Sequence, residues 1–171
     1  ERGERRPVLA LVPGIGDIDV LAASELMEAG RAVTAGLVTP DRTLTIASLS
    51  RFYVMNEKIA MGDGRYDSGR LMQAIAQHSQ RHVLFDMDEV ARSTGAIVNA
   101  VMLGAIAGCG RLPIPAEEFE RAIRADGKAV EANLRGFRAG FDAAQQTDAA
   151  RREPEPRKRS TVAANADIAN D

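Results

Sequence analysis

Short apolar runs alternate with helical patterns along most of this chain, and that alternation limits the possible folds more than any other feature. A brief apolar run closed by turn residues is typical of a buried strand. The predicted strands are Val8–Val12, Ile18–Ala23, Leu44–Ser50 and His82–Phe85. Runs that are apolar on both faces and separated by helices predict an α/β fold, a three-layer α/β/α sandwich with a mostly parallel sheet.

Helical patterns fill the intervals between these runs. In the first of them Ser24 is the expected N-cap, acidic residues follow in the first turn, and Gly36 closes the pattern. The remaining helices are predicted at residues 67–80, 87–95, 96–110 and 116–124. Each has apolar residues at helical spacing and a capping or glycine signal at an end.

The pattern over residues 96–110 differs from the others because apolar residues lie on nearly every side of it. Such a helix is buried on nearly every side. Ala100, Gly104, Ala107 and Gly108 form a stripe of small residues that lets another backbone come close. Two interpretations stay open: the stripe packs on the sheet of its own domain, or it lies at a subunit interface.

Asn99 is the polar exception in this apolar stretch. A buried amide without partners costs about 1–3 kcal/mol, so we expect Asn99 to be hydrogen-bonded. The partner is a nearby loop or strand end in one interpretation, and a ligand or cofactor in the other. The helix that follows, residues 116–124, has one apolar face and is expected at the surface.

Polar residues that follow predicted strands are candidates for ligand contacts, because α/β sheets bind ligands at the carboxyl ends of their strands. Ser24 and Glu25 follow one strand, and Asp86 follows another. Helix capping is the competing role for all three, and for Asp86 it is the favoured one. Asp88 and Glu89 lie in the same cluster as Asp86.

The stretch 51–66 is the least regular part of the sequence and contains a Gly-Asp-Gly turn signal. Polar residues on such a loop often make functional contacts, so Asn56, Glu57 and Lys58 are candidates. The predicted cofactor-binding residues are Ser24, Glu25, Asn56 and Asn99. The sequence identifies no catalytic residue.

Composition excludes several classes of protein. A net charge of -2 and a pI near 5.8 do not favour nucleic-acid binding. No apolar stretch is long enough to span a bilayer, so we expect no membrane partner. The single cysteine, Cys109, excludes a disulfide within the chain and suits the cytoplasm. It is expected to be buried and inert.

Metal binding is not predicted. His78 and His82 are four residues apart, but a helix ends and a strand begins between them. No carboxylate or thiol is placed to complete a site with them.

The sequence predicts one domain over residues 1–146 and a disordered linker or tail over residues 147–171. The tail has almost no large apolar residue, so it cannot bury enough surface to offset its chain entropy. The chain starts with "ERGERRP" and without Met, which suggests a processed protein or a piece of a longer one.

Several ordered segments resemble one enzyme family. The segment "VMLGAIAGCGRLPIPAEEFERAIR" (residues 101–124) resembles the gamma-type subunit or domain of 2-oxoacid:acceptor oxidoreductases. The segments "DVLAASELMEAGRAVTAGLVTPDRTLTIAS" (residues 19–48) and "MGDGRYDS" (residues 61–68) are similar to the beta subunit of indolepyruvate oxidoreductases. The resemblance extends from about Val8 to Phe141.

This resemblance implies a component of an enzyme that oxidatively decarboxylates a 2-oxo acid, such as the aryl pyruvate indolepyruvate, and passes electrons to ferredoxin. Thiamine diphosphate and iron–sulfur clusters are then expected on a partner subunit, with no cofactor bound by this chain alone. It further implies contacts with that thiamine-binding subunit and with a second copy, and places Ser24 and Glu25 near the partner. The lone cysteine agrees, because each cluster needs several thiolates.

One departure from the family pattern affects the expected fold. Family members begin with a strand and a Gly-x-Gly-Gly-Gln-Gly loop that opens a helix, and this sequence shows no such βα unit. Its nearest likeness, "PGIGDID" at residues 13–19, leads into a strand and is interpreted as a turn.

The hypothesis that competes with an oxidoreductase component is a stand-alone nucleotide- or acyl-carrier-binding module without redox activity.

Overall fold

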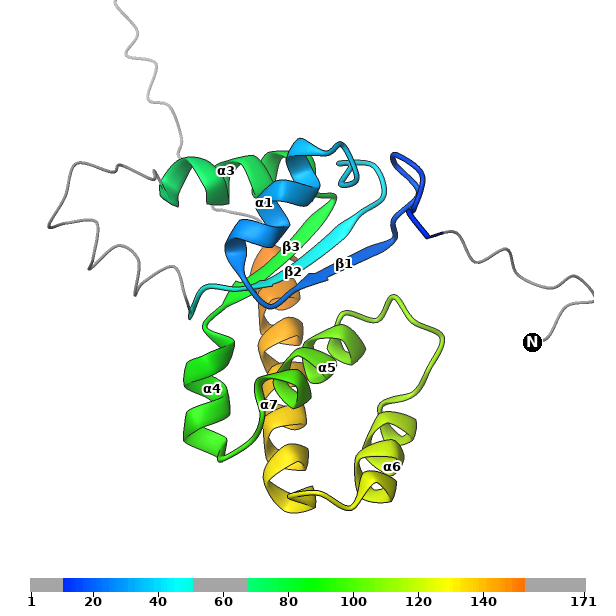
Figure 1. The fold of residues 1–171 in the computed structure, drawn as a ribbon, viewed down its shortest axis with the longest axis vertical. Helices are drawn as coiled ribbons and strands as arrows, with labels where there is room; N and C mark the ends of the chain where they lie inside the picture. The colour runs from blue at the N-terminus through cyan, green and yellow to red at the C-terminus, as the bar shows by residue number, and fades with distance from the viewer. Residues whose placement is uncertain (1–10, 51–67, 153–171) are drawn as a thin grey trace, which may run out of the picture.

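The structure is a computed structural model that describes residues 11–50 and 68–152 (Figure 1). Three strands and six helices are assigned in this part of the chain. In chain order they are β1 (Val20–Ala23), α1 (Leu26–Thr34), β2 (Leu44–Ser48), α3 (Ser68–His78), β3 (Arg81–Phe85), α4 (Met87–Thr94), α5 (Val98–Gly108), α6 (Ala116–Asp126) and α7 (Val130–Arg152).

The three strands form a parallel sheet in the order β1-β2-β3. Val20 pairs with Leu44 at one end of β1, and Ser48 pairs with Phe85 at the other end of β2. Every residue of β2 is buried, because the central strand is covered on both faces. The predicted α/β class with a parallel sheet between helix layers is therefore confirmed.

Helices α1 and α3 cover one face of the sheet (Figure 1). Their apolar stripes meet Ala23 and Ala47 of the strands, and Leu26, Ala29 and Ile75 are the buried helix residues of this cluster. Gly30 of α1 lies against Leu71 of α3, where a side chain would collide with it. The small residue therefore lets the two helices approach each other closely.

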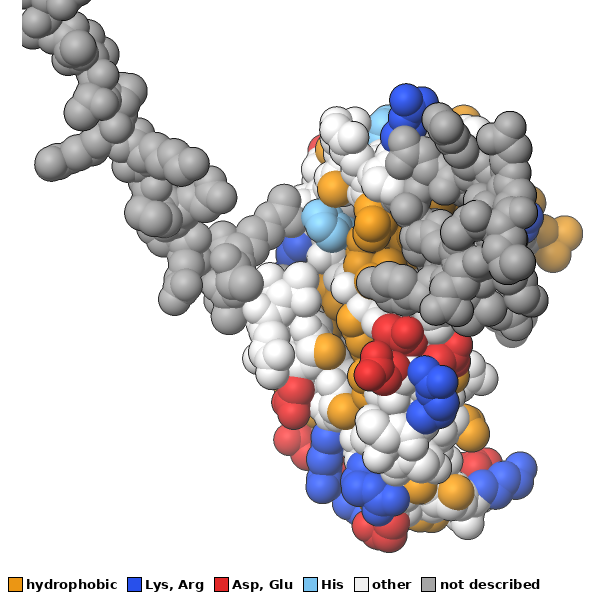
Figure 2. Space-filling view, turned by 90° about the vertical axis from the view of Figure 1, so that its left-hand side faces the viewer, with side chains coloured by type: hydrophobic (Ala, Val, Ile, Leu, Met, Phe, Trp, Pro, Cys, Tyr) orange, Lys and Arg blue, Asp and Glu red, His pale blue; other side chains and the backbone are white. Residues whose placement is uncertain are grey.

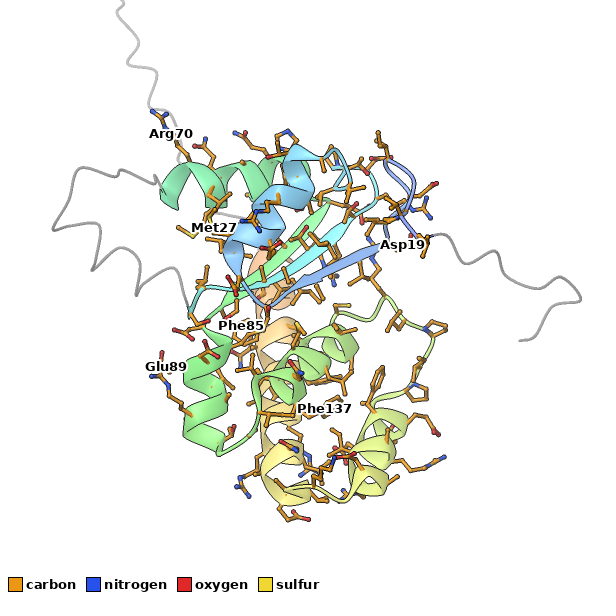
Figure 3. The ribbon with its side chains drawn as sticks, in the orientation of Figure 1. Asp19, Met27, Arg70, Phe85, Glu89 and Phe137 are labelled. Atoms are coloured by element: carbon orange, nitrogen blue, oxygen red, sulfur yellow. The ribbon has the colours of Figure 1, made fainter. Side chains whose placement is uncertain are left out.

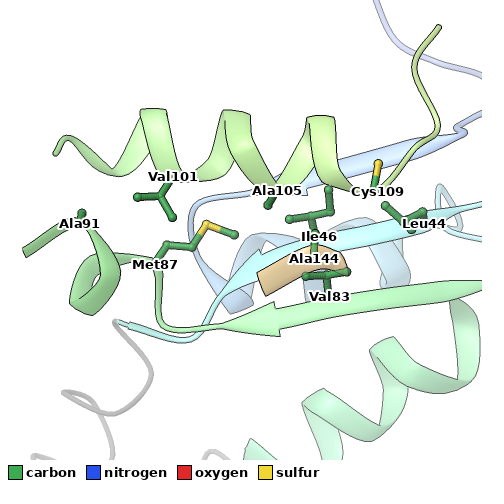
Figure 4. Packing of buried hydrophobic residues seen from close by; sticks show 9 residues of the cluster. All are labelled: Leu44, Ile46, Val83, Met87, Ala91, Val101, Ala105, Cys109 and Ala144. Atoms are coloured by element: carbon green, nitrogen blue, oxygen red, sulfur yellow. The ribbon is translucent and has the colours of Figure 1, made fainter. Parts of the chain in front are cut away.

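Helices α4, α5 and α7 cover the opposite face. In Figure 4, Val101 and Ala105 of α5 lie on the side of the helix that faces the cluster of Leu44, Ile46 and Val83, and Cys109, which follows α5, belongs to the same cluster. Met87 and Ala91 of α4 and Ala144 of α7 complete this cluster. Burial of these side chains, at roughly 25 cal/mol per Å² of apolar area, is the main source of stability on this face.

The two glycines of the small-residue stripe of α5 pack on α7 of the same chain and not on the sheet. A Cβ added to Gly108 would lie 2.5 Å from the carbonyl oxygen of Phe141. Gly140 of α7 lies in the same way against the main chain of Val101. Glycines on both helices thus permit a backbone-to-backbone crossing, with Phe137 fully buried beside it.

Helix α6 is the outermost element, as its half-apolar pattern predicts, and none of its residues is buried. Phe119 of α6 stacks on Phe137 of α7 with ring centroids 6.1 Å apart. Glu120 accepts hydrogen bonds from Arg138 of α7 at 3.0 and 3.2 Å. One aromatic contact and one ion pair therefore fasten α6 to the rest of the molecule.

Three expectations about local structure are wrong. Leu11 and Val12 are exposed bend residues and not part of a strand, while residues 8–10 lie outside the described part. Ser24 is not a cap: Glu25 holds the N-cap position of α1, and its side chain makes no capping hydrogen bond. Asn99 is exposed, because the first turn of α5 extends past the sheet, so it is not a buried amide.

Two boundaries differ from the sequence-based expectation. No helix is predicted after residue 124, yet α7 is the longest helix described. It continues to Arg152 and so enters the stretch expected to be a tail from residue 147; residues 153–171 lie outside the described part. The turn predicted at residues 13–19 is confirmed, since Asp17 N–H bonds the Gly14 carbonyl at 3.2 Å and Gly16 has φ +74°.

Candidate functional site

The carboxyl ends of the three parallel strands define the candidate site. β1 ends at Ala23, β2 at Ser48 and β3 at Phe85. In Figure 3, Phe85 lies at this edge above Glu89 of α4, and Asp19 lies at the opposite edge of the sheet. In open α/β sheets ligands bind outside the carboxyl ends of the strands.

A serine pair connects the end of β2 to the start of α4. Ser48 Oγ accepts hydrogen bonds from the main-chain N–H groups of Met87 at 3.1 Å and Ser50 at 3.4 Å. Its distance to Ser50 Oγ is 3.0 Å. Either hydroxyl can be the donor in this contact, and both residues are buried.

Beside this pair lies an open hollow of about 770 Å³. Its polar lining is provided by Ser50, Asp86, Asp88 and Arg92, and its apolar lining includes Ile97 and Val98. Ligand sites typically measure about 300–1,000 Å³ and combine apolar walls with a few polar groups. The hollow therefore has the size and composition of a site for a small molecule or for part of a partner chain.

The acidic residues of the hollow have separable roles. Asp86 is the N-cap of α4, and its carboxylate accepts the Glu89 N–H at 2.9 Å, so the favoured capping role is confirmed. Asp88 and Glu89 follow in the first turn, where the helix dipole favours negative charge. Figure 2 views the molecule from the side of α4 and shows acidic side chains gathered beside basic ones. The rim of the hollow is thus charged with both signs.

Ser24 and Glu25 follow β1 directly, at the same edge of the sheet as Asp86. Ser24 is exposed and Glu25 is half-buried. Since Ser24 does not cap α1, its hydroxyl is not needed for that helix. The structure therefore brings Ser24, Glu25 and Asp86 to one edge, as the strand pattern predicts.

Asn99 belongs to a different depression. It lines a cleft of about 250 Å³ between α5, α6 and α7, and Ile97 is the residue that lines both the cleft and the hollow. Ile97 is 59% exposed. Asn56, Glu57 and Lys58 lie outside the described residues, so the structure does not place them.

The amino end of the sheet has an ion-pair cluster of a structural kind. Arg42 donates to Asp19 at 2.9 Å and to Asp17 at 3.1 Å. The hydrogen bond from Arg42 lowers the pKa of Asp19, and the same bond raises the pKa of Arg42. All three side chains are at least 42% exposed, and this cluster fastens the chain before β1 to the loop before β2.

No group of three or more metal-binding side chains occurs within residues 11–50 and 68–152. His78 ends α3, with its Nδ1 2.9 Å from the Ala74 carbonyl oxygen, while His82 lies on β3. Cys109 is buried and its Sγ lies 2.9 Å from the Ile106 carbonyl oxygen. With one cysteine in the sequence, the chain by itself does not offer the several thiolates that a cluster needs.

Sequence reasoning missed Ser50 and Arg92, which line the hollow, and Ser48, which lies beside it. Ser48 and Ser50 were assigned to the end of a strand, where a hydroxyl gives no sign of being a hydrogen-bond hub. Arg92 reaches the hollow only because the turn between α4 and α5 at Gly95, with φ +70°, folds the two helices back on each other. The position of Ser50 after a buried strand was the available signal.

A search of the described residues for membrane-spanning helices finds no single helix of sufficient length and apolarity. Helices α4 and α5 taken together reach the length and apolarity of a membrane span, but the pair is bent by 114°.

Comparisons with curated proteins and with solved structures found no match. One family model, described as pyruvate ferredoxin/flavodoxin oxidoreductase, matches residues 4–143. The matched range includes the whole sheet, the serine pair and both depressions. The chain therefore belongs to the pyruvate ferredoxin/flavodoxin oxidoreductase family, as a component of that type of oxidoreductase.

Proposed function

We propose that the chain is a gamma-type component, similar to the indolepyruvate oxidoreductase beta subunit, of a complex that oxidatively decarboxylates a 2-oxo acid. An aryl pyruvate such as indolepyruvate is the proposed substrate, and ferredoxin is the proposed acceptor. The observation that carries the proposal is the family match over residues 4–143, joined to the segments that resemble the indolepyruvate enzymes.

Thiamine diphosphate supplies the decarboxylation chemistry and iron–sulfur clusters move the electrons when they are bound to the partner subunit. The single, buried Cys109 supports cluster ligation outside this chain. In this proposal the chain acts in the cytoplasm, is inactive alone, and also contacts a second copy of itself.

We assign the carboxyl edge of the sheet as the face that meets the thiamine-binding partner or its cofactor. Ser24 is exposed there, Glu25 and Asp88 are half-buried, and the buried Ser50 lines the hollow. The hydroxyl and carboxylate groups of the hollow can accept hydrogen bonds from a partner, and Arg92 can donate to a phosphate or to a peptide carbonyl. Asn56 and Asn99 stay predictions as ligand contacts.

The test is purification of the full-length protein from its native cells. Co-eluting material is assayed for iron, for thiamine diphosphate and for arylpyruvate-dependent dye reduction. The proposal expects all three to elute together, and it expects the separated chain to have no such activity. A chain that elutes alone and without iron would instead support the binding-module hypothesis, for which the hollow beside Ser50 is the site to screen.

A further inference from the structure

One wall of the hollow beside Ser50 is formed by the turn between α4 and α5. Gly95, Ala96 and Ile97 make up this turn, and all three line the hollow. Ile97 is 59% exposed and also lines the cleft between α5, α6 and α7. The position of the turn therefore determines how the Ile97 side chain is presented at the site.

The turn is only partly held by the helix that it follows. Gly95 N–H donates to the Arg92 carbonyl at 3.3 Å, and Ala96 N–H donates to the Ala91 carbonyl at 2.9 Å. Both bonds close the end of α4. Ile97 is the N-cap residue of α5, and its aliphatic side chain makes no capping hydrogen bond. The Ile97 N–H finds its acceptor on a different helix.

Helix α7 supplies that acceptor through Asn133. This residue is 7% exposed, and its Oδ1 accepts the Ile97 N–H at 3.2 Å. Its Nδ2 donates to the Lys128 carbonyl at 3.0 Å, and Lys128 lies in the connection between α6 and α7. One buried amide thus joins the start of α5 to the start of α7.

Two more residues of α7 contact the same turn. Arg135 Nε and Nη2 donate to the Thr94 carbonyl at 3.3 and 3.1 Å, at the end of α4, where helix carbonyls lack partners within the helix. A Cβ added to Gly136 would lie 2.4 Å from the Cβ of Ala96, so the α7 backbone lies close against the turn. Thr94, Ala96 and Ile97 are therefore each held by a different residue of α7, which lies against α4 and α5 (Figure 1).

The contacts from α7 reach the site only through the turn. Neither Asn133 nor Arg135 is among the described residues that line the hollow. A protein surface that is already held in its bound conformation loses less entropy when a partner binds. Ile97 is an exposed aliphatic side chain in a lining that also contains charged residues, and interfaces combine an apolar centre with a polar rim in this way.

We propose that Asn133 and Arg135 are positioning residues for the partner-binding edge of the sheet. They hold the turn of residues 94–97 so that Ile97 meets the thiamine-binding partner as an apolar contact within a charged rim. The inference rests on the proposed function, which assigns this edge to that partner. It adds the contacting residue and the two residues that orient it.

The first test uses the full-length chain and the partner subunit, separated from the purified complex and mixed again. Asn133→Asp keeps an oxygen for the Ile97 N–H and loses the donor to Lys128, whereas Asn133→Leu has the same branched shape and loses both. We expect Asn133→Leu to weaken association by about tenfold or more and Asn133→Asp by less than about threefold. Urea unfolding of the isolated chain should show both variants to be less stable, so that lost stability alone does not explain the difference.

Hydrogen exchange of the isolated chain tests the positioning without the partner. The Ile97 amide should exchange slowly in the wild type and in Asn133→Asp, and at least about tenfold faster in Asn133→Leu. The control is the Ser79 amide, which donates to the Ile75 carbonyl at the end of α3. Its exchange should be the same in all three proteins.

Two further variants test Arg135 and Ile97. Arg135→Gln should weaken association by about threefold or more, because the bonds to the end of α4 are lost. Arg121→Gln is its matched control, since it makes the same change of charge at an exposed residue of α6 that pairs with Glu118 of its own helix. Ile97→Asp should weaken association by about tenfold, while the exposed position leaves folding intact.

The inference is overturned if Asn133→Leu associates as the wild type does, or if Asn133→Asp and Asn133→Leu lose affinity equally. An Ile97 amide that exchanges equally fast in the wild type and in Asn133→Leu overturns it as well. Failure of the proposed function is a separate result, seen as the absence of iron and thiamine diphosphate from material that co-elutes with the wild-type chain. A complex that contains both, and whose assembly is unaffected by Ile97→Asp, would remove this contact and leave the proposed function standing.

Discussion

A Cβ added to Gly104 would lie inside the carbonyl oxygen of Phe137, so the main chains of α5 and α7 touch at this point. The carbonyl belongs to a helix backbone and has no flexible end that could move aside. Relief requires α7 and α5 to move apart, and α7 contributes the fully buried Phe137 to the core.

We therefore expect Gly104→Ala to lower the free energy of unfolding by about 1–3 kcal/mol or more, despite the better helix propensity of alanine. Urea denaturation followed by circular dichroism measures the change. Asn99→Ala, an exposed change in the same helix, should shift stability by no more than about 0.5 kcal/mol. Equal effects of the two variants would show that the close crossing is not tight in solution.

Ser48→Ala tests the connection between β2 and α4. The change removes the acceptor for the Met87 N–H in a buried position, where an unsatisfied group costs about 1–3 kcal/mol. Ser93→Ala is the control, because the exposed Ser93 hydroxyl only bonds a carbonyl of its own helix, and it should cost less than about 0.5 kcal/mol. Thermal and urea unfolding of both variants distinguish the two cases, and a neutral Ser48→Ala would mean that water replaces the hydroxyl.

The sequence predicts the sheet well because its signals are local. Runs such as Leu44–Ser50 are short, apolar and closed by turn residues, and Asp86 and Gly95 mark the two ends of one helix by their own chemistry. Leu11 and Val12 show the limit of that method, since an apolar run becomes a strand only where a neighbouring strand pairs with it.

The site is less predictable because it depends on contacts between parts of the chain that are distant in sequence. The burial of residues 98–108 is visible in the sequence, but the partner that contacts Gly104 is a helix whose weak amphipathic pattern gave no prediction. Asn99 is exposed because α5 begins beyond the edge of the sheet, and helix position relative to a sheet is a tertiary property. The hollow beside Ser50 likewise depends on the angle between α4 and α5.

The ion pair between α6 and α7 predicts a pH effect. Hydrogen bonds from Arg138, aided by the charges of Arg138 and Arg124, lower the pKa of Glu120 from its usual 4.5. A carboxyl group whose folded-state pKa is depressed stabilises the fold above its unfolded pKa, and that contribution disappears as the pH falls through the folded pKa. Stability from this pair is therefore complete above about pH 5 and declines below pH 4.5.

Glu120→Gln removes this contribution. The urea midpoints of the variant and the wild type should differ near neutral pH and converge at acid pH, because the wild-type carboxyl is then protonated. Carbon NMR titration of the Glu120 carboxyl measures its pKa directly. A titration at or above 4.5 would contradict the prediction, as would a constant difference between the two proteins across the acid range.

The last prediction concerns the carboxyl edge of the sheet. Asp88→Asn removes a charge from the hollow without removing the Asp86 cap, and Ser24→Ala removes a hydroxyl that caps no helix. If this edge meets the partner or its cofactor, each change should lower the arylpyruvate-dependent activity of the assembled complex by about tenfold, while unfolding of the isolated chain stays within about 0.5 kcal/mol of the wild type. Ser93→Ala on the outer side of α4 is the control for both measurements. Activity that is unchanged in Asp88→Asn and Ser24→Ala, with the complex intact, would remove this edge from the proposed function and leave the family membership unaffected.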